Sequence, residues 1–517
     1  MKDRISTRKR SQAVKDCAPP MKNILLPLTL LSLLFAAGCG GGGPSAPPPN
    51  NGFSNSSLSG QYAYRLEGYF YTSSSAVPYA EAGVFTANAN GSITSGTDDL
   101  LVSGSALATS TSVNGSYAVN SDGTGSITLN NTGLGSIFGT SNSAISLAVT
   151  LASTSKLYLI ETDGANTYGV AELQSSATLA SLPSGPYTFR IHDQGTASRA
   201  GAFSVSTGQL TGSEDLLAGG TLDNGTGSPL ALTGSLLTPS GGRGTGSFND
   251  GISTVDFIYY VVDANNIRIL RTDSGLVSLG RAETQSGTFT SNAAFSGSYA
   301  FGSRADDSSS LSGQNTVGVI TADGSGHITG GAYDAVIDGT PVSNAAINSG
   351  GTYTVFQDGS VSVNFTTSTG ASIQQIFWLV SPSRAFFLTN DSTKYEDGIA
   401  DLQQSSSFSN SSLSGSYAFV MDGFVENTAN IDRVGWISGD GNGNMGWLET
   451  VNSTGQPSAP GQLTGTYTVA SNGRATATVN SVSQANNDLV FYMVSPSQAY
   501  ILQDFTGYEI IGAMDLQ

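Results

Sequence analysis

Apolar and polar residues alternate in short runs along most of the chain. The run RATATVNSV at 474–482 separates alanine and valine from arginine and threonine, and KLYLIETD at 156–163 alternates similarly. A period of two indicates a β-strand with one buried face. Asp-Gly or Asn-Gly pairs, which favour tight hairpins, begin at 122, 323, 358 and 472. No stretch after residue 39 shows a sustained period of 3.6 residues, so the sequence predicts an all-β protein with very little helix.

The same phrases open and close four successive stretches of the chain. The opening phrases are LSGQYAY at 58, LPSGPYTF at 182, FSGSYAF at 295 and LSGSYAF at 413; the closing phrases are GVAELQ at 169, GRAETQ at 280, GIADLQ at 398 and GAMDLQ at 512. A longer opening, FSNSSLSG, occurs at both 53 and 408. Repetition of this kind is the signature of tandem units. We predict four β repeats of about 110–125 residues, at 57–176, 177–288, 289–405 and 406–517.

The fourth copy indicates how many strands each repeat contains. Strand patterns occur at 415–423, 433–438, 444–451, 463–470, 473–481, 488–494, 498–503 and 509–516. An antiparallel meander of eight strands can close as a barrel, which removes its exposed edges. This prediction is similar to avidin-like and lipocalin-like barrels in strand count and length only, and the likeness implies no function. A two-sheet sandwich and a propeller built from half-copies are the alternatives.

One tyrosine recurs two residues after the glycine of every opening phrase. The four residues are Tyr62, Tyr187, Tyr299 and Tyr417. We predict that each ring is buried over the end of its barrel, with the hydroxyl on a backbone group. The alternative is a ligand-contact residue repeated at the barrel mouth.

The segment before the repeats has the features of an export signal. Lys22 precedes an apolar run of 14 residues at 24–37, which is too short to span a membrane as a helix. The run continues into AAGC at 36–39, which resembles the lipobox of bacterial lipoproteins, with alanine in place of the usual leucine. The resemblance implies that residues 1–38 are removed and that Cys39 is lipidated. An ordinary signal peptide is the alternative, and the basic segment before Met21 leaves the true start open.

A stretch rich in glycine, proline and serine follows, at 39–56. Because it has no apolar period, it is predicted to be an unfolded tether. By the same resemblance, Gly40 in place of an aspartate favours the outer membrane over the inner one. We therefore expect a lipid-anchored protein of the outer membrane, surface-exposed or periplasmic.

Composition excludes several kinds of partner. Removing residues 1–38 leaves 13 basic and 36 acidic side chains, a formal charge of −23, which makes nucleic acid a poor partner. The two cysteines, Cys17 and Cys39, lie on either side of the predicted cleavage site, so a disulfide framework is excluded. A glycan or protein ligand stays open, and no cofactor motif occurs.

The histidines give little support for catalysis or zinc binding. His192 lies in an apparent strand and His327 in a hairpin, at different places in their copies, and the other copies have none. Neither a Ser-His-Asp triad nor a two-histidine zinc site is indicated. We interpret both as solvated or half-buried side chains.

The segment SGDGNGNMGWLE at 438–449 partly matches a calcium-binding loop. Its candidate ligands are Asp440, Asn442 and Glu449. A serine at the first place and the lack of flanking helices argue against calcium. Asparagine and glycine are also typical of a hairpin turn.

Paired carboxylates are candidates for glycoside hydrolysis. The pairs are Asp98-Asp99, Glu214-Asp215 and Asp306-Asp307, and Asp334 follows a comparable turn. We interpret this recurring acidic position as a solvated strand end or turn cap. Trp378, Trp436 and Trp447 could stack on sugars, but core packing is the favoured interpretation.

Two hypotheses for the function follow. The first is a non-enzymatic lipoprotein whose β repeats serve as a binding or structural module. The second is a secreted carbohydrate-active enzyme or other hydrolase with its site in one divergent copy. Unusual residues look scattered over the copies in the sequence, which favours the first.

Overall fold

The computed structural model describes residues 49–71, 76–102, 108–133, 144–194, 197–225, 227–273, 277–306, 313–390, 394–425, 429–480 and 487–517. Ser45–Gln517 form one compact unit. The predicted signal segment, Cys39 and most of the predicted tether lie outside the described residues. Among the described residues, none of the helices is long and apolar enough to span a membrane.

Barrel 1 is an antiparallel meander. It contains β1 (Ser59–Tyr71), β2 (Ala76–Asn88), β3 (Ser92–Val102), β4 (Ala108–Val119), β5 (Thr124–Asn130), β6 (Ile145–Ser153), β7 (Lys156–Glu161) and β8 (Ala165–Leu173). Each strand pairs with the next, and β1 pairs with β8, so the sheet closes.

Barrel 2 follows the same plan with one short added strand. It contains β9 (Gly185–Asp193), β10 (Ala197–Ser206), β11 (Gln209–Ala218), β12 (Thr221–Leu222), β13 (Leu230–Leu236), β14 (Arg243–Asn249), β15 (Thr254–Val261), β16 (Asn266–Arg271) and β17 (Ser278–Thr284). The pairings β9–β17 and β10–β11 close it around eight strands.

Barrel 3 has its fourth strand divided in two. It contains β18 (Ser296–Asp306), β19 (Gly313–Asp323), β20 (His327–Ile337), β21 (Thr340–Ile347), β22 (Gly351–Val355), β23 (Ser360–Thr366), β24 (Ser372–Ser381), β25 (Arg384–Thr389) and β26 (Tyr395–Leu402). Both β21 and β22 pair with β20, and β18 pairs with β26.

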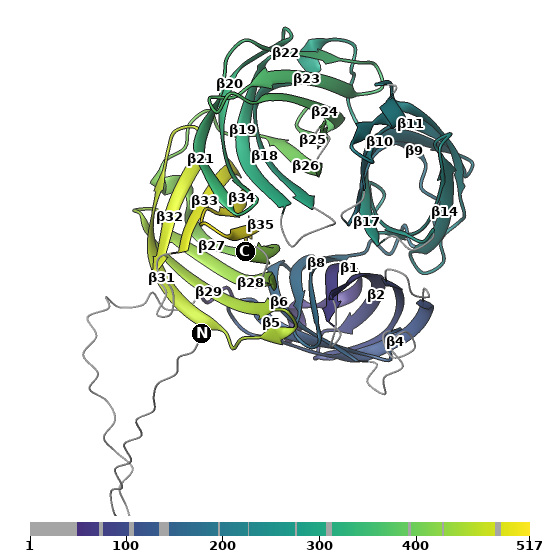
Figure 1. The fold of residues 1–517 in the computed structure, drawn as a ribbon. Coiled ribbons are helices and arrows are strands. Elements are labelled where there is room, and N and C mark those ends of the chain that lie inside the picture. Colours follow the sequence, from purple (N-terminus) through teal and green to yellow (C-terminus); the bar gives the residue numbers. More distant parts are fainter. Residues whose placement is uncertain are drawn as a thin grey trace, which may run out of the picture. The chain divides into compact units, whose positions relative to one another are not determined.

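Barrel 4 ends the chain. It contains β27 (Ser414–Val425), β28 (Ala429–Asp440), β29 (Asn444–Ser453), β30 (Gln456–Pro457), β31 (Gly461–Val469), β32 (Arg474–Asn480), β33 (Asn487–Ser495), β34 (Gln498–Gln503) and β35 (Tyr508–Leu516). All eight strands predicted for this copy are present, and β30 is a two-residue addition. Closure by β27 and β35 confirms the barrel and excludes the sandwich and the propeller (Figure 1).

Side chains fill each barrel. The inward faces form four separate apolar clusters, one per barrel. The repeated opening phrase FSNSSLSG covers one end as a short 3-10 helix, η1 (Asn55–Ser57) in barrel 1 and η4 (Asn410–Ser412) in barrel 4. Asn55 and Asn410 each accept a backbone hydrogen bond of 2.8 Å from the fourth strand of their barrel. The described residues contain two further 3-10 helices, η2 (Asp223–Gly225) and η3 (Asn292–Ala294).

The recurring tyrosines are buried, as predicted. The rings are at most 2% exposed. Their hydroxyls donate to backbone carbonyls in the turn between the sixth and seventh strands: Tyr62 to Thr154 at 2.6 Å, Tyr187 to Ala264 at 3.1 Å, Tyr299 to Pro382 at 2.6 Å and Tyr417 to Pro496 at 2.6 Å. The same side chain therefore ties the first strand to a distant turn in every barrel.

Candidate functional site

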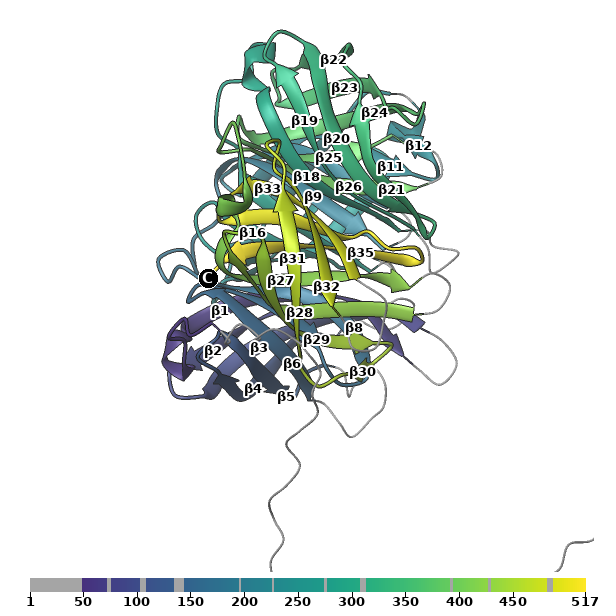
Figure 2. The same cartoon turned by 90° about the vertical axis from the view of Figure 1, so that its left-hand side faces the viewer.

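Each barrel packs its outer wall against the next barrel along the chain, and barrel 4 packs against barrel 1. An apolar cluster fills each of the four interfaces, and each interface sets the first three strands of one barrel against the last three of the next. Each cluster contains residues of both barrels: Ala82 and Leu279, Leu217 and Trp378, Val319 and Tyr492, and Val434 and Ile160 are examples. Figures 1 and 2 both place β28 beside β6 and β8. The contacts therefore close in a ring.

The last glutamine of each closing phrase joins its barrel to the next one. Its side-chain amide donates to backbone carbonyls there: Gln174 to Val261 at 2.5 Å, Gln285 to Leu379 at 3.0 Å, Gln403 to Met493 at 2.8 Å and Gln517 to Leu151 at 2.8 Å. The first three act along the chain, and the fourth returns from barrel 4 to barrel 1. A head-to-tail interface that repeats and closes in this way is the geometry of a cyclic oligomer, here built within one chain.

The acidic residue of each closing phrase makes a second recurring contact across the same interfaces. Its partners lie on the seventh strand of the next barrel: Glu172 meets Arg268 at 2.6 Å, Glu283 meets Arg384 at 2.8 Å, Asp401 meets Tyr500 at 2.6 Å and Asp515 meets Lys156 at 2.5 Å. Burial opposes the charged form of Glu172 and Glu283, but the surrounding guanidinium groups outweigh it and lower the pKa of both carboxyls to about 2.

These contacts surround a cavity of about 270 Å³ where the four barrels meet. All four barrels contribute to its wall. Of the 13 basic residues after residue 38, seven line it: Arg65, Lys156, Arg190, Arg268, Arg281, Arg304 and Arg384. Four carboxylates line it as well: Glu67, Glu172, Asp397 and Asp422. Residues 39–517 carry a formal charge of −23, yet the basic side chains that line this cavity outnumber the acidic ones that line it.

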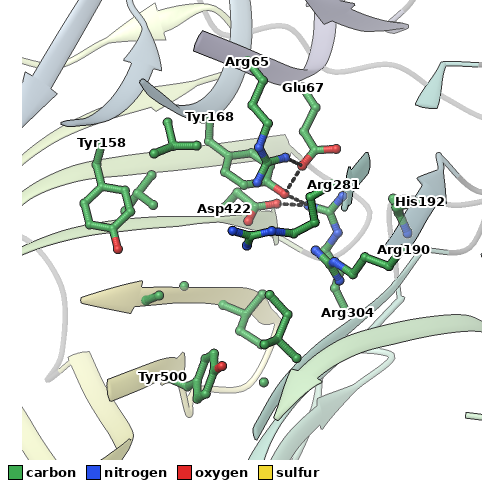
Figure 3. Close-up of a pocket in the computed structure, with 18 of the residues that line it drawn as sticks. Arg65, Glu67, Tyr158, Tyr168, Arg190, His192, Arg281, Arg304, Asp422 and Tyr500 are labelled. Atoms are coloured by element: carbon green, nitrogen blue, oxygen red, sulfur yellow. Dashed lines mark hydrogen bonds and ion pairs between the residues drawn. The ribbon is translucent and has the colours of Figure 1, made fainter. Parts of the chain in front are cut away.

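Ion pairs across the cavity connect different barrels. Arg304 of barrel 3 pairs with Asp422 of barrel 4 and donates to the hydroxyl of Tyr168 in barrel 1 at 2.7 Å. Arg190 of barrel 2 pairs with Asp397 of barrel 3. Figure 3 shows Arg65, Arg190, Arg281 and Arg304 close together, with Tyr158 and Tyr500 apart from them.

The charge state of Arg281 reflects this crowding. Burial, together with the neighbouring guanidinium groups of Arg268 and Arg384, lowers the pKa of Arg281 to about 9, against the attraction of Glu283. The shift is large for an arginine, which is ordinarily protonated at any pH that a protein experiences. The protonated form of Arg281 is therefore disfavoured by its burial and by repulsion from the neighbouring arginines.

Comparisons with known proteins add little to this picture. No family model and no curated protein matches the chain. Among solved structures, Transferrin Binding Protein B from Haemophilus parasuis is similar at 9% identity and a TM-score of 0.17, over 70% of this chain and 82% of that chain. Transferrin binding protein B from Neisseria meningitidis gives 9% identity and a TM-score of 0.17, over 70% and 84%. TM-scores this low carry no argument about fold or function.

The recurring aspartates are not solvated, so the interpretation as solvated strand ends was wrong. Asp99, Asp215 and Asp334 are at most 3% exposed, because the next barrel covers the strand face that carries them. Asp99 and Asp334 do each accept a backbone hydrogen bond of 2.8 Å from the following strand, as a cap would. Asp99 accepts from Arg243 at 2.6 and 2.8 Å, and Asp334 accepts from Arg474 at 2.6 and 2.7 Å. These three aspartates join barrels.

Asp215, and the carboxylates that precede Asp99 and Asp215 in the sequence, have partners other than an arginine of the next barrel. Asp215 accepts a hydrogen bond of 2.7 Å from the indole of Trp378 in barrel 3. Asp98 accepts from the hydroxyl of Tyr64 at 3.3 Å and from the backbone of Gly133 at 2.7 Å. Glu214 pairs with Arg199. Asp306 ends β18, and residue 307 lies outside the described residues.

His192 is more buried than predicted. It is 5% exposed, and its Nδ1 faces Asp397. Ser198 lies within 3.1 Å of the same carboxylate, so serine and histidine share it rather than standing in the order of a catalytic triad. His327 is exposed beside Asp323 at 3.1 Å, in agreement with the solvated interpretation.

The structure does not bring the calcium candidates together. Asp440 accepts backbone hydrogen bonds from Asn442 at 2.7 Å and Asn444 at 3.0 Å, which are the contacts of a hairpin turn. Glu449 lies opposite Gly435, about 17 Å along the strands from that turn, and pairs with Arg433 at 3.3 Å. Hydrogen bonds within the turn lower the pKa of Asp440 to about 2.

The tryptophans pack inside the protein, as favoured. Trp378, Trp436 and Trp447 are at most 2% exposed.

The residues that sequence reasoning missed are the basic ones of the cavity wall. Their signal was present at Arg281, since this place in the other closing phrases carries valine, isoleucine or alanine.

Proposed function

We propose that this chain is a non-enzymatic lipoprotein of the cell envelope, in which a lipid on Cys39 holds a four-barrel binding module to the outer membrane. The proposal rests on where the structure places the candidate catalytic carboxylates. Asp99, Asp215 and Asp334, candidate carboxylates of a hydrolase, are buried between barrels, where Asp99 and Asp334 accept hydrogen bonds from arginines. Asp98 and Glu214 are buried inside their own barrels. Apolar side chains pack the barrel interiors, and polar and charged side chains of all four barrels line the shared cavity, so we take that cavity as the place for a ligand.

A hydrolase with its site in one divergent copy is the alternative. The second copy does diverge from the others at the cavity. It contributes Arg190, Arg268 and Arg281 but no carboxylate to the wall, whereas hydrolysis of a glycoside needs two carboxyl groups at a defined separation. The four carboxylates that the other copies contribute are each paired with an arginine. This difference favours binding.

The anchor is tested by replacing the predicted lipidation site. We expect Cys39→Ser to abolish incorporation of a labelled fatty acid and to release the protein from the membrane fraction, because no thiol remains to carry the diacylglycerol. Cys17→Ser is the matched control, since residue 17 precedes the predicted cleavage site, and it should label like the wild type. An unlabelled wild-type protein, or equal labelling of the two variants, would show that Cys39 carries no lipid.

A further inference from the structure

Three arginines stand directly opposite one another on the outer wall of barrel 2. Arg281 on β17 is the cross-strand partner of Arg190 on β9 and of Arg268 on β16. Like charges in directly opposite positions of an antiparallel pair are destabilising. The row therefore needs a cause other than the stability of its own sheet.

The other three barrels show that the fold does not need this row. The residues in the same register are Arg65, Val170 and Tyr158 in barrel 1, Gly302, Ile399 and Phe386 in barrel 3, and Val420, Ala513 and Tyr500 in barrel 4. All three barrels close with the same strand order. A small or apolar residue thus suffices at the place of Arg281, and arginine there is a special feature of the second copy.

The two outer arginines of the row already have partners in neighbouring barrels. Arg268 pairs with Glu172 of barrel 1, and Arg190 pairs with Asp397 of barrel 3. Arg281 instead shares Glu283 with Arg384, at 2.9 and 2.8 Å from the two Nε atoms. Glu283 thus pairs with two guanidinium groups beside the cavity, and Arg384 has a second carboxylate partner in Asp401 at 2.8 Å.

We propose that the cavity binds a compact oxyanion with two or more negative charges, and that Arg281 contacts it from between Arg190 and Arg268. The planar guanidinium fork matches pairs of oxygens on a phosphate or a carboxylate. Partial exclusion of water strengthens such contacts. The lowered pKa of Arg281 agrees with a site that gains stability when an anion enters. A volume of about 270 Å³ limits the ligand to a small molecule or to the end of a larger one.

Carboxylates near the cavity oppose the binding of an anion, so the ligand must carry enough negative charge to overcome them. Four carboxylates, Glu67, Glu172, Asp397 and Asp422, line the wall with the seven basic side chains. Three more, Glu283, Asp401 and Asp515, pair with Arg281, Arg384 and Lys156 from outside the lining, so each cation has a carboxylate partner. An anion with a single charge gains little against that background, whereas one with several charges can engage more than one guanidinium at once. Inorganic pyrophosphate and citrate are suitable probes, because they share this charge and differ in the oxygen-bearing group.

Isothermal titration calorimetry of the purified full chain at constant ionic strength tests the proposal. Wild type should bind pyrophosphate or citrate with one-to-one stoichiometry. Arg281→Ile, which installs the residue found at 399 in the third copy, should bind at least about tenfold more weakly. Lys394→Gln removes one positive charge outside the cavity, where Lys394 pairs with Asp338, and should bind within about twofold of wild type.

The variant also separates binding from folding. Removing the central charge relieves the like-charge row, so the urea midpoint of Arg281→Ile should equal or exceed that of wild type. If it falls instead, Arg281→Lys keeps the charge and loses the fork, and should still weaken binding. Absence of wild-type binding up to about 10 mM of both probes, or equal affinities of wild type and both Arg281 variants, would overturn the proposal. These outcomes are independent of fatty-acid labelling at Cys39, since the cavity is formed without the anchor.

Discussion

Tyr417→Ala should lower the free energy of unfolding by about 3–5 kcal/mol. The ring of Tyr417 is fully buried in the core of barrel 4, so truncation leaves a cavity that the surrounding strands cannot fill. The loss also breaks the 2.6 Å hydrogen bond to the carbonyl of Pro496, which holds the turn between β33 and β34. Urea unfolding followed by tyrosine and tryptophan fluorescence measures the change.

Tyr417→Phe is the control, because it keeps the ring and removes the hydroxyl alone. We expect it to cost about 0.5–1.5 kcal/mol, the net contribution of a typical hydrogen bond, because Pro496 is exposed and water can reach its carbonyl. Equal midpoints for wild type and Tyr417→Ala would contradict the packing role. That result would favour the alternative, in which the recurring tyrosine contacts a ligand at the barrel mouth.

The interface between barrels 2 and 3 should weaken as the pH rises from about 5 to 8. Burial, followed by the nearby charge of Asp223, raises the pKa of Asp215 to about 8, against the hydrogen bond from Trp378. A carboxyl with a raised pKa binds its proton in the folded state and loses it in the unfolded state above its ordinary pKa of about 4. Stability from this group is therefore present at acid pH and is lost as the pH approaches 8.

Asp215→Asn isolates this contribution. Asparagine keeps an acceptor for Trp378 and does not titrate, so the free-energy difference between wild type and variant should change by up to about 4 kcal/mol between pH 5 and 8. Groups that do not interact with Asp215 titrate alike in both proteins and cancel in the difference, whereas Asp223, whose pKa is raised by burial against the lowering effect of its hydrogen bond to Asp215, contributes to it. Urea midpoints at several pH values provide the measurement, and a difference that stays constant with pH would refute the assignment.

The strands and their closure could be predicted because each barrel repeats a local pattern. The alternation of apolar and polar residues, the Asp-Gly turns and the position of Tyr417 all depend on residues within one copy. The same pattern occurs in four copies, which makes it easier to recognise. Burial of the tyrosines was predictable for the same reason. Proximity of the opening and closing phrases followed from the meander, and the register of Tyr417 with Leu516 confirms it.

The interfaces could not be predicted, because they depend on the face that each barrel turns to the next. Asp99 looks like a solvated strand residue until barrel 2 covers it and supplies Arg243. The closing glutamine Gln517 reads as the end of a strand, and only the ring gives its amide a partner in barrel 1. Arg190 and Arg281 are 91 positions apart in the sequence and become neighbours only through barrel closure.

Small-angle X-ray scattering of the Cys39→Ser chain, which needs no detergent, tests most directly whether the four barrels close in a ring around the cavity. A closed arrangement predicts a radius of gyration below about 30 Å for the folded part, because barrel 4 returns to barrel 1 through contacts such as Asp515 with Lys156. Four barrels of this size in a line would give about 40 Å. A value near 30 Å or below supports the ring, and a value near 40 Å would contradict both the ring and the shared cavity.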